Sequence, residues 1–182
     1  VPPDPADVKV YWTVDFHAPQ SDAVTATPPL VYGDVVLVSV YQKGTLCLRI
    51  LPDGSYRELW RNRRNFVSQF NPMVCVDGYV YGWHFFDKSF RCVELTTGNV
   101  RWTHKSQVCR GTHFAVGGRM ILLGEYGELA SIEINPNETV ECAMTGSGLL
   151  ASPGFSAPAL CDGRLFLRNE HELICLDLRP PR

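Results

Sequence analysis

The sequence predicts an all-β fold, a β-propeller of about four four-stranded antiparallel blades, and two observations carry this prediction. Turn pairs typical of tight hairpins begin at residues 33, 77, 117 and 162, so similar segments recur about every 40–45 residues. Each segment contains short strand-like stretches, and one such small sheet cannot bury both of its faces unless neighbouring sheets stack on it. A β-sandwich is the alternative, but a sandwich gives no reason for a fixed period.

The clearest repeat runs from Phe70 to Trp102. Its turn pair Asp77-Gly78 separates the first two strands, and Thr96–Gly98 is a turn before the last strand. A tryptophan closes this unit at Trp102, as Trp60 closes the unit before it. The four predicted strands are 71–76, 79–85, 90–95 and one beginning at Val100.

The remaining units follow in chain order. Residues 1–7 are expected to be a linker, residues 8–16 a single strand, and residues 179–182 a tail. The repeat domain spans residues 8–178, and its blades are predicted at about 26–60, 69–102, 110–143 and 155–178. The third unit lacks the closing tryptophan. The fourth has three strands and ends at a proline-rich stretch that cannot continue a ladder.

Trp12 lies in the predicted strand Val8–Phe16, and its flanks resemble those of the closing tryptophans. One hypothesis is that this strand completes the blade of residues 155–178 and closes a four-bladed ring, which would cover the sheet edges. The other is that the chain is half of a larger propeller, as a monomer or as a dimer that completes a larger ring. Trp12, Trp60 and Trp102 are predicted to pack blade against blade.

The chain contains seven cysteines, an odd number that cannot pair completely within one chain. Cys47, Cys92 and Cys175 share one repeat position in the third strand, where the third unit has Ser131. We expect small buried thiols that pack one sheet on the next. No cysteine or histidine spacing indicates a zinc site, and no metal ligand is predicted.

A formal net charge of −2 on 182 residues gives no electrostatic argument for a nucleic acid partner. No apolar run has the length of a membrane span, and Val1 does not begin a signal-peptide pattern.

The repeats resemble the pyrroloquinoline-quinone-like β-propeller repeat family. The residues that carry the resemblance are ATPPLVYGDVVLV, NPMVCVDGYVYG with RCVELTTGNVRW, and APALCDGRLFLRN with LICLDL. The order of units is also similar to the C-terminal half of larger bacterial quinone-like and outer-membrane-assembly-like propeller proteins. That resemblance implies a periplasmic or cell-envelope location and favours half of a larger propeller.

The resemblance also implies two functional classes, because these repeats serve both enzymes and scaffolds. Quinone-dependent dehydrogenases of this kind hold pyrroloquinoline quinone and calcium at the propeller axis, commonly above a pair of adjacent cysteines, and this sequence has no Cys-Cys pair. Asp87, Glu125 and Glu170 fall near successive second turns, where acidic residues are common for solubility. His84 and His171 lie there too. We therefore predict no catalytic residue and no cofactor, with a quinone-dependent dehydrogenase as the alternative.

The links between units carry cations that could bind an acidic peptide or a glycan acid through charge-assisted hydrogen bonds. The sequence thus predicts a binding or scaffolding module with a rigid face for a protein or small acidic ligand. The aromatic residues Phe66, Phe70, Trp83, Phe85 and Phe86 are expected to be core or blade-packing residues. The predicted binding residues are Arg61, Arg63, Arg64, His104, Lys105 and Arg110.

Overall fold

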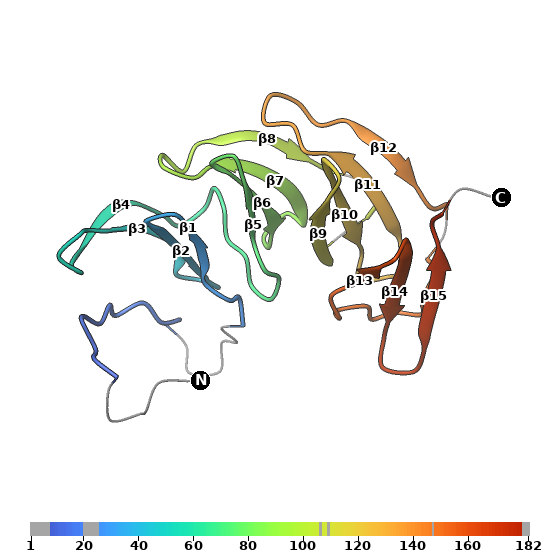
Figure 1. Ribbon diagram of the computed structural model, residues 1–182, viewed down its shortest axis with the longest axis horizontal. Helices are drawn as coiled ribbons and strands as arrows, with labels where there is room; N and C mark the ends of the chain where they lie inside the picture. Colours follow the sequence, from blue (N-terminus) through green and yellow to red (C-terminus); the bar gives the residue numbers. More distant parts are fainter. Residues whose placement is uncertain (1–7, 20–25, 106, 109, 147, 180–182) are drawn as a thin grey trace.

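The computed structural model describes residues 8–19, 26–105, 107–108, 110–146 and 148–179. The predicted linker 1–7 and the last three residues of the predicted tail lie outside these ranges. Fifteen strands in the described part of the chain form four antiparallel sheets, which follow one another along an open arc (Figure 1). This confirms the all-β, blade-like architecture.

Each blade is one sheet whose strands lie in chain order. Blade 1 comprises β1 (Leu30–Tyr32), β2 (Val35–Val40), β3 (Gly44–Ile50) and β4 (Tyr56–Asn62). Blade 2 comprises β5 (Val74–Val76), β6 (Tyr79–His84), β7 (Ser89–Glu94) and β8 (Val100–His104). Blade 3 comprises β9 (Thr112–Val116), β10 (Arg119–Leu123), β11 (Leu129–Glu133) and β12 (Glu141–Met144). Blade 4 comprises β13 (Ala159–Cys161), β14 (Arg164–Arg168) and β15 (Leu173–Asp177).

The first turn of each blade is where the sequence places it. Asp77 and Gly78 have φ values of 50° and 78°, and Asp162 and Gly163 have 48° and 70°. Two successive positive φ values give the twist that matches two antiparallel strands, and Asp and Gly tolerate this conformation. The turn pairs therefore fix the register of the first hairpin in each blade.

The core consists of apolar layers between successive blades. Blades 1 and 2 bury Leu37, Cys47 and Val80 between them. Blades 2 and 3 bury a layer that includes Phe90 and Met120. Blades 3 and 4 meet through leucines, namely Leu123, Leu150, Leu165 and Leu167. Each blade is thus covered by its neighbour, as the repeat predicts.

Two expectations need correction. Residues 8–16 form no strand; they run in an irregular conformation along blade 1 and are not paired with β15. A strand needs a neighbour that offers backbone hydrogen bonds, and this segment covers the face of a sheet instead of extending its edge. Cys47 and Cys92 are buried as expected, but Cys175 is exposed, because no described strand flanks β15 on its outer side.

Candidate functional site

One end of the blades collects the second turns and the links from each fourth strand to the next blade. Strands in chain order alternate in direction, so the β2–β3, β6–β7, β10–β11 and β14–β15 turns lie at the same end as these links. We call this end the link face. Backbone hydrogen bonds tie the links to the turns: Phe85 N–H donates to the carbonyl of Val67 at 2.8 Å, and Gly154 N–H donates to that of Glu125 at 2.9 Å.

An aromatic cluster lies on the link face where blades 1 and 2 meet. The ring of Tyr41, in the β2–β3 turn, lies 4.6 Å from Phe85 and 6.3 Å from Phe86 in the β6–β7 turn. The guanidinium of Arg110 lies 5.7 Å from the Phe85 ring centre. Phe86 is 54% exposed. The expectation that Phe86 packs in the core is therefore wrong, whereas Phe66 and Trp83 are buried as expected.

Most of the predicted binding cations pair with carboxylates. Arg110 lies 2.8 Å from the buried carboxylate of Glu125, and Lys88 approaches the same group at 3.8 Å. Lys105 lies 3.8 Å from Asp87. These three pairs join turns and links of blades 2 and 3, so they stabilise the arrangement of these segments on the link face.

Two more of the predicted cations also have carboxylate partners. Arg61 binds Glu58 on its own strand at 2.9 Å, and His104 lies 3.1 Å from Glu141 of the next blade. Arg63 and Arg64 are exposed and form no ion pair with the described residues. The two arginines are therefore the cations best placed to meet a ligand.

Asp87 holds the turn that carries Phe86. Burial opposes ionisation of its carboxyl, but hydrogen bonds from Ser89 and the charge of Arg91 outweigh it and lower the pKa of Asp87. Arg91 also donates to the carbonyl of Asn65 in the adjoining link. Asp87 thus connects the β6–β7 turn to the adjoining links through its ion pairs with Arg91 and Lys105.

Two histidines are buried near this face. Burial lowers the pKa of both His84 and His113 to about 4, so both are neutral near pH 7. His84 accepts a hydrogen bond from the backbone N–H of Val67 at 3.0 Å, and His113 Nε2 lies 3.2 Å from the carbonyl of Tyr81. Both rings therefore hold backbone groups in place by hydrogen bonds.

The residues that the structure describes do not fit a quinone–calcium centre. No group of three or more His, Cys, Asp or Glu side chains among them is arranged to hold a metal ion. Calcium takes six to eight oxygen ligands. Asp87 and Glu125 are committed to Lys105, Arg91, Arg110 and Lys88. That the chain binds no cofactor stays a prediction, and quinone binding with calcium stays part of the alternative hypothesis, until experiment tests them.

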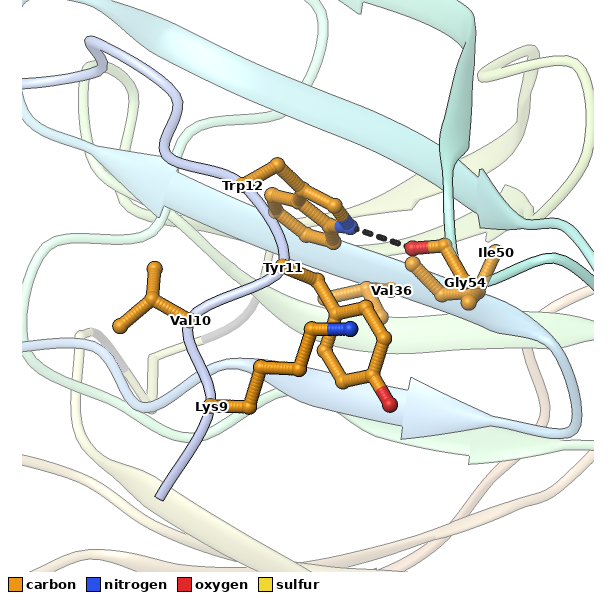
Figure 2. Close-up of a pocket in the computed structure, with 7 residues that line it drawn as sticks. All are labelled: Lys9, Val10, Tyr11, Trp12, Val36, Ile50 and Gly54. Atoms are coloured by element: carbon orange, nitrogen blue, oxygen red, sulfur yellow. Dashed lines mark hydrogen bonds between the residues drawn. The ribbon is translucent and has the colours of Figure 1, made fainter. Parts of the chain in front are cut away.

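Of the three predicted blade-packing tryptophans, Trp60 and Trp102 lie between blades, whereas Trp12 lies on the irregular segment against blade 1. Trp60 on β4 donates its indole N–H to the carbonyl of Leu95 in blade 2 at 2.8 Å, and Trp102 on β8 donates to that of Asn135 in blade 3 at 2.7 Å. Trp12 makes the same kind of bond to the carbonyl of Gly54 in blade 1 at 2.9 Å (Figure 2). The ring of Trp12 also lies 4.6 Å from Tyr56.

Sequence reasoning missed the exposed aromatic residues of the link face. Besides Phe86, these include Tyr126 at 49% and Phe155 at 47% exposure. Phe155 lies 6.2 Å from Phe70, so two links that are distant in sequence meet. Their position in second turns and links was the available signal, since these segments converge at one end of a propeller.

The fold and this arrangement of blades define the class as a β-propeller. No family model matches the chain, and no curated protein matches it at a significant level. BamB from Moraxella catarrhalis is similar in structure, with a TM-score of 0.66 and 13% identity over 87% of this chain and 48% of that chain. A computationally designed protein, Ika4, has a TM-score of 0.62 and 10% identity over 92% of this chain and 100% of its own.

A europium-containing methanol dehydrogenase is also similar, with a TM-score of 0.54 and 17% identity over 72% of this chain and 26% of that chain. The chain thus spans about half of BamB and about a quarter of the dehydrogenase. These similarities, all below 25% identity, show the propeller fold. No helix in the described residues has the length and hydropathy of a membrane span.

Proposed function

We propose that this chain is a non-catalytic binding module whose link face recognises an acidic, aromatic-containing segment of a partner protein. The observation that carries the proposal is that the exposed ring of Phe86 lies on the same link face as two exposed arginines, Arg63 and Arg64, for which the described residues offer no ion pair. Aromatic residues and arginine are enriched among the residues that dominate binding energy at protein interfaces.

The geometry supports a shared surface. A Cβ on Gly44, the first residue of β3 after the turn that carries Tyr41, would stand 2.7 Å from the Cα of Arg63, so the link begins in contact with this hairpin. Tyr41 in turn contacts Phe85 and Phe86. The ligand would therefore meet an aromatic surface flanked by positive charge. The surrounding cations share the carboxylates of Asp87 and Glu125, which offset only part of their positive charge, so the link face as a whole favours an acidic ligand.

The rigidity of this surface also favours a binding role. The Asp87 and Glu125 ion pairs and the Arg91–Asn65 hydrogen bond join two turns to two links. A preformed surface loses less conformational entropy on binding, which improves affinity without additional contacts.

The test is a fluorescence-polarisation titration with a labelled peptide of alternating Asp and Phe residues. Phe86→Ser and the double variant Arg63→Ala/Arg64→Ala should each weaken binding by at least tenfold, and added salt should weaken binding further. Tyr32→Ser is the matched control, because Tyr32 is 41% exposed and lies at the opposite end of blade 1. Equal loss in the control, or no binding by the unmodified chain, would contradict the proposal. If a uronic-acid oligosaccharide bound and the peptide did not, the ligand class would be a glycan acid instead of a peptide.

The enzymatic alternative is tested separately. The chain is incubated with pyrroloquinoline quinone and calcium, and a bound chromophore and dye-linked alcohol oxidation are measured. Turnover by the loaded chain would overturn the non-catalytic assignment. A periplasmic or cell-envelope location is part of the proposal; it is supported by the structural similarity to BamB and is tested by fractionating the source cells.

A further inference from the structure

Trp12 lies against blade 1 in the same way as a fourth-strand tryptophan lies against the following blade. Trp60 and Trp102 each donate to a carbonyl in the third turn of the next blade, and Trp12 donates to Gly54 in the third turn of blade 1. Along residues 11–17 half-buried and exposed side chains alternate, as in a strand. Segment 8–16 therefore lies where the fourth strand of a preceding blade would lie, although no described strand pairs with it (Figure 2).

At the other end of the arc, β15 lacks a fourth-strand neighbour among the described strands. Leu173 is 68% exposed and Leu178 is 53% exposed, and Cys175 between them is exposed as well. An edge strand with apolar side chains and free backbone groups is a ready template for another strand. The chain thus has a fourth-strand segment at one end and an edge without a fourth strand at the other.

The register of the complete blades predicts how these two parts would pair. Cys47 pairs with Trp60 and Cys92 pairs with Trp102, and in both blades a bulge follows the cysteine. Cys175 occupies the equivalent position, since it pairs with β14 at Phe166 as Cys47 pairs with β2. In these blades, the residue of the fourth strand that pairs with this cysteine is therefore a tryptophan.

Applying this register to segment 8–16 places Trp12 opposite Cys175 and Lys9 opposite Asp177. The second pair brings together opposite charges. Within the described chain, Asp177 forms an ion pair with Arg179 alone. The pairing would cover large apolar side chains that are more than half exposed in the single chain. These are Val8, Val10, Leu173 and Leu178.

The faces of the end blades are complementary too. The face of blade 1 that points away from blade 2 carries Val36 and Val38, and segment 8–16 covers it incompletely, leaving cavities of about 350 and 520 Å³. On blade 4, Leu165 and Leu167 pack against blade 3, so the alternate residue Phe166 and its neighbours Leu173 and Cys175 point the other way. Each end thus presents an apolar face of the kind that meets between blades.

We propose that the two ends join between two copies of this chain, so that segment 8–16 of each copy becomes the fourth strand beside β15 of the other. Figure 1 shows segment 8–18 and β15 at opposite ends of the open arc, which separates them within one copy. Two identical joints related by a twofold axis close a ring. The arc matches 48% of the BamB chain, so two copies together have about the length of that chain.

The first experiment is light scattering across a concentration series of the 182-residue chain. A mass near twice the 20.4 kDa chain mass, falling toward 20.4 kDa on dilution, is expected. Cys175→Arg should abolish the larger species, whereas Cys142→Arg, at an exposed cysteine of β12, should not. A mass of 20.4 kDa at every concentration, or equal effects of the two variants, would overturn the proposal.

A second experiment uses the unmodified chain and does not depend on the folding of a variant. Copies labelled with ¹⁴N and ¹⁵N are mixed and treated with a carbodiimide, which joins a lysine to a nearby carboxylate. A Lys9–Asp177 cross-link between differently labelled copies is expected, together with concentration-dependent protection of Cys175, but not of Cys142, from iodoacetamide. Cross-links only within one copy would show ring closure by a single chain and overturn the proposal.

Discussion

The tryptophan bond between blades gives a prediction whose magnitude follows from the structure. Trp102→Ala removes a hydrogen bond to Asn135, worth about 1 kcal/mol net, and leaves that carbonyl without its partner. It also removes ring contacts at 5.9 Å to Tyr81 and 6.3 Å to Phe90, each worth about 0.5–1.5 kcal/mol. Trp102 is only half-buried, so we expect a loss of about 3 kcal/mol, at the low end of the range for such truncations.

Scanning calorimetry and urea unfolding measure this loss. For a chain of this length, about 3 kcal/mol corresponds to a drop in Tm of roughly 6–12 °C. Trp102→Phe keeps most of the ring contacts and removes the N–H donor, so it should cost about 1 kcal/mol. Val31→Ala is the control, because Val31 is 66% exposed and a surface change of this kind should shift stability by less than about 0.5 kcal/mol. If Trp102→Ala behaved like Val31→Ala, the blades would not be held together by this residue.

Two further predictions concern the buried polar groups. Burial holds the pKa of both His113 and His84 at about 4, so the unfolded chain binds protons first and the free energy of unfolding should fall as pH drops from about 6.5 to 4. In urea titrations at several pH values, His113→Gln should make this fall less steep, and the contribution of His84 should remain. Glu125→Gln removes the charge that Arg110 and Lys88 share, and it should cost about 1–3 kcal/mol in urea unfolding, whereas Glu133→Gln, at an exposed position of β11, should leave the free energy of unfolding unchanged.

The sequence predicts the blades well because their determinants are local. A turn pair such as Asp77-Gly78 fixes a hairpin through its own backbone conformation, and the Cys92–Trp102 pair repeats that of Cys47 and Trp60. The strand boundaries in the structure differ from the predicted ones by only a few residues. Each repeat therefore carries enough information to specify one sheet.

The site is less predictable because its contacts join different blades. The sequence shows Arg110 as a cation in a link, but Glu125, which neutralises it, lies in a turn of blade 3. Residues Phe85 and Phe86 are neighbours of one type, yet only the second is exposed. Segment 8–16 has the alternation of a strand, but forming a ladder also needs an edge within reach. Ion pairing, side-chain exposure and strand pairing all depend on which segments of the chain lie next to one another in the folded structure.

Blade 3 departs from the repeat, and we therefore expect its joint with blade 4 to be the weakest of the three. Ala143 stands opposite Ser131, where the other blades have Trp and Cys, and a cavity of about 250 Å³ lies beside it next to Leu178. Hydrogen exchange should therefore be faster in β14 and β15 than in β6 and β7, because local opening follows the least stable contacts.

Ala143→Trp tests the cause of that weakness. The indole would fill the cavity, and Leu178 follows β15 as Leu95 follows β7, so its carbonyl is available to accept the N–H bond that Leu95 accepts from Trp60. Exchange in β14 and β15 should slow by about tenfold if the substitution adds about 1.4 kcal/mol to the joint. Ala115→Trp, at an exposed position of β9, is the control and should leave this exchange unchanged. Slower exchange in the control alone, or an unchanged rate in Ala143→Trp, would mean that the missing tryptophan does not limit the stability of blade 4.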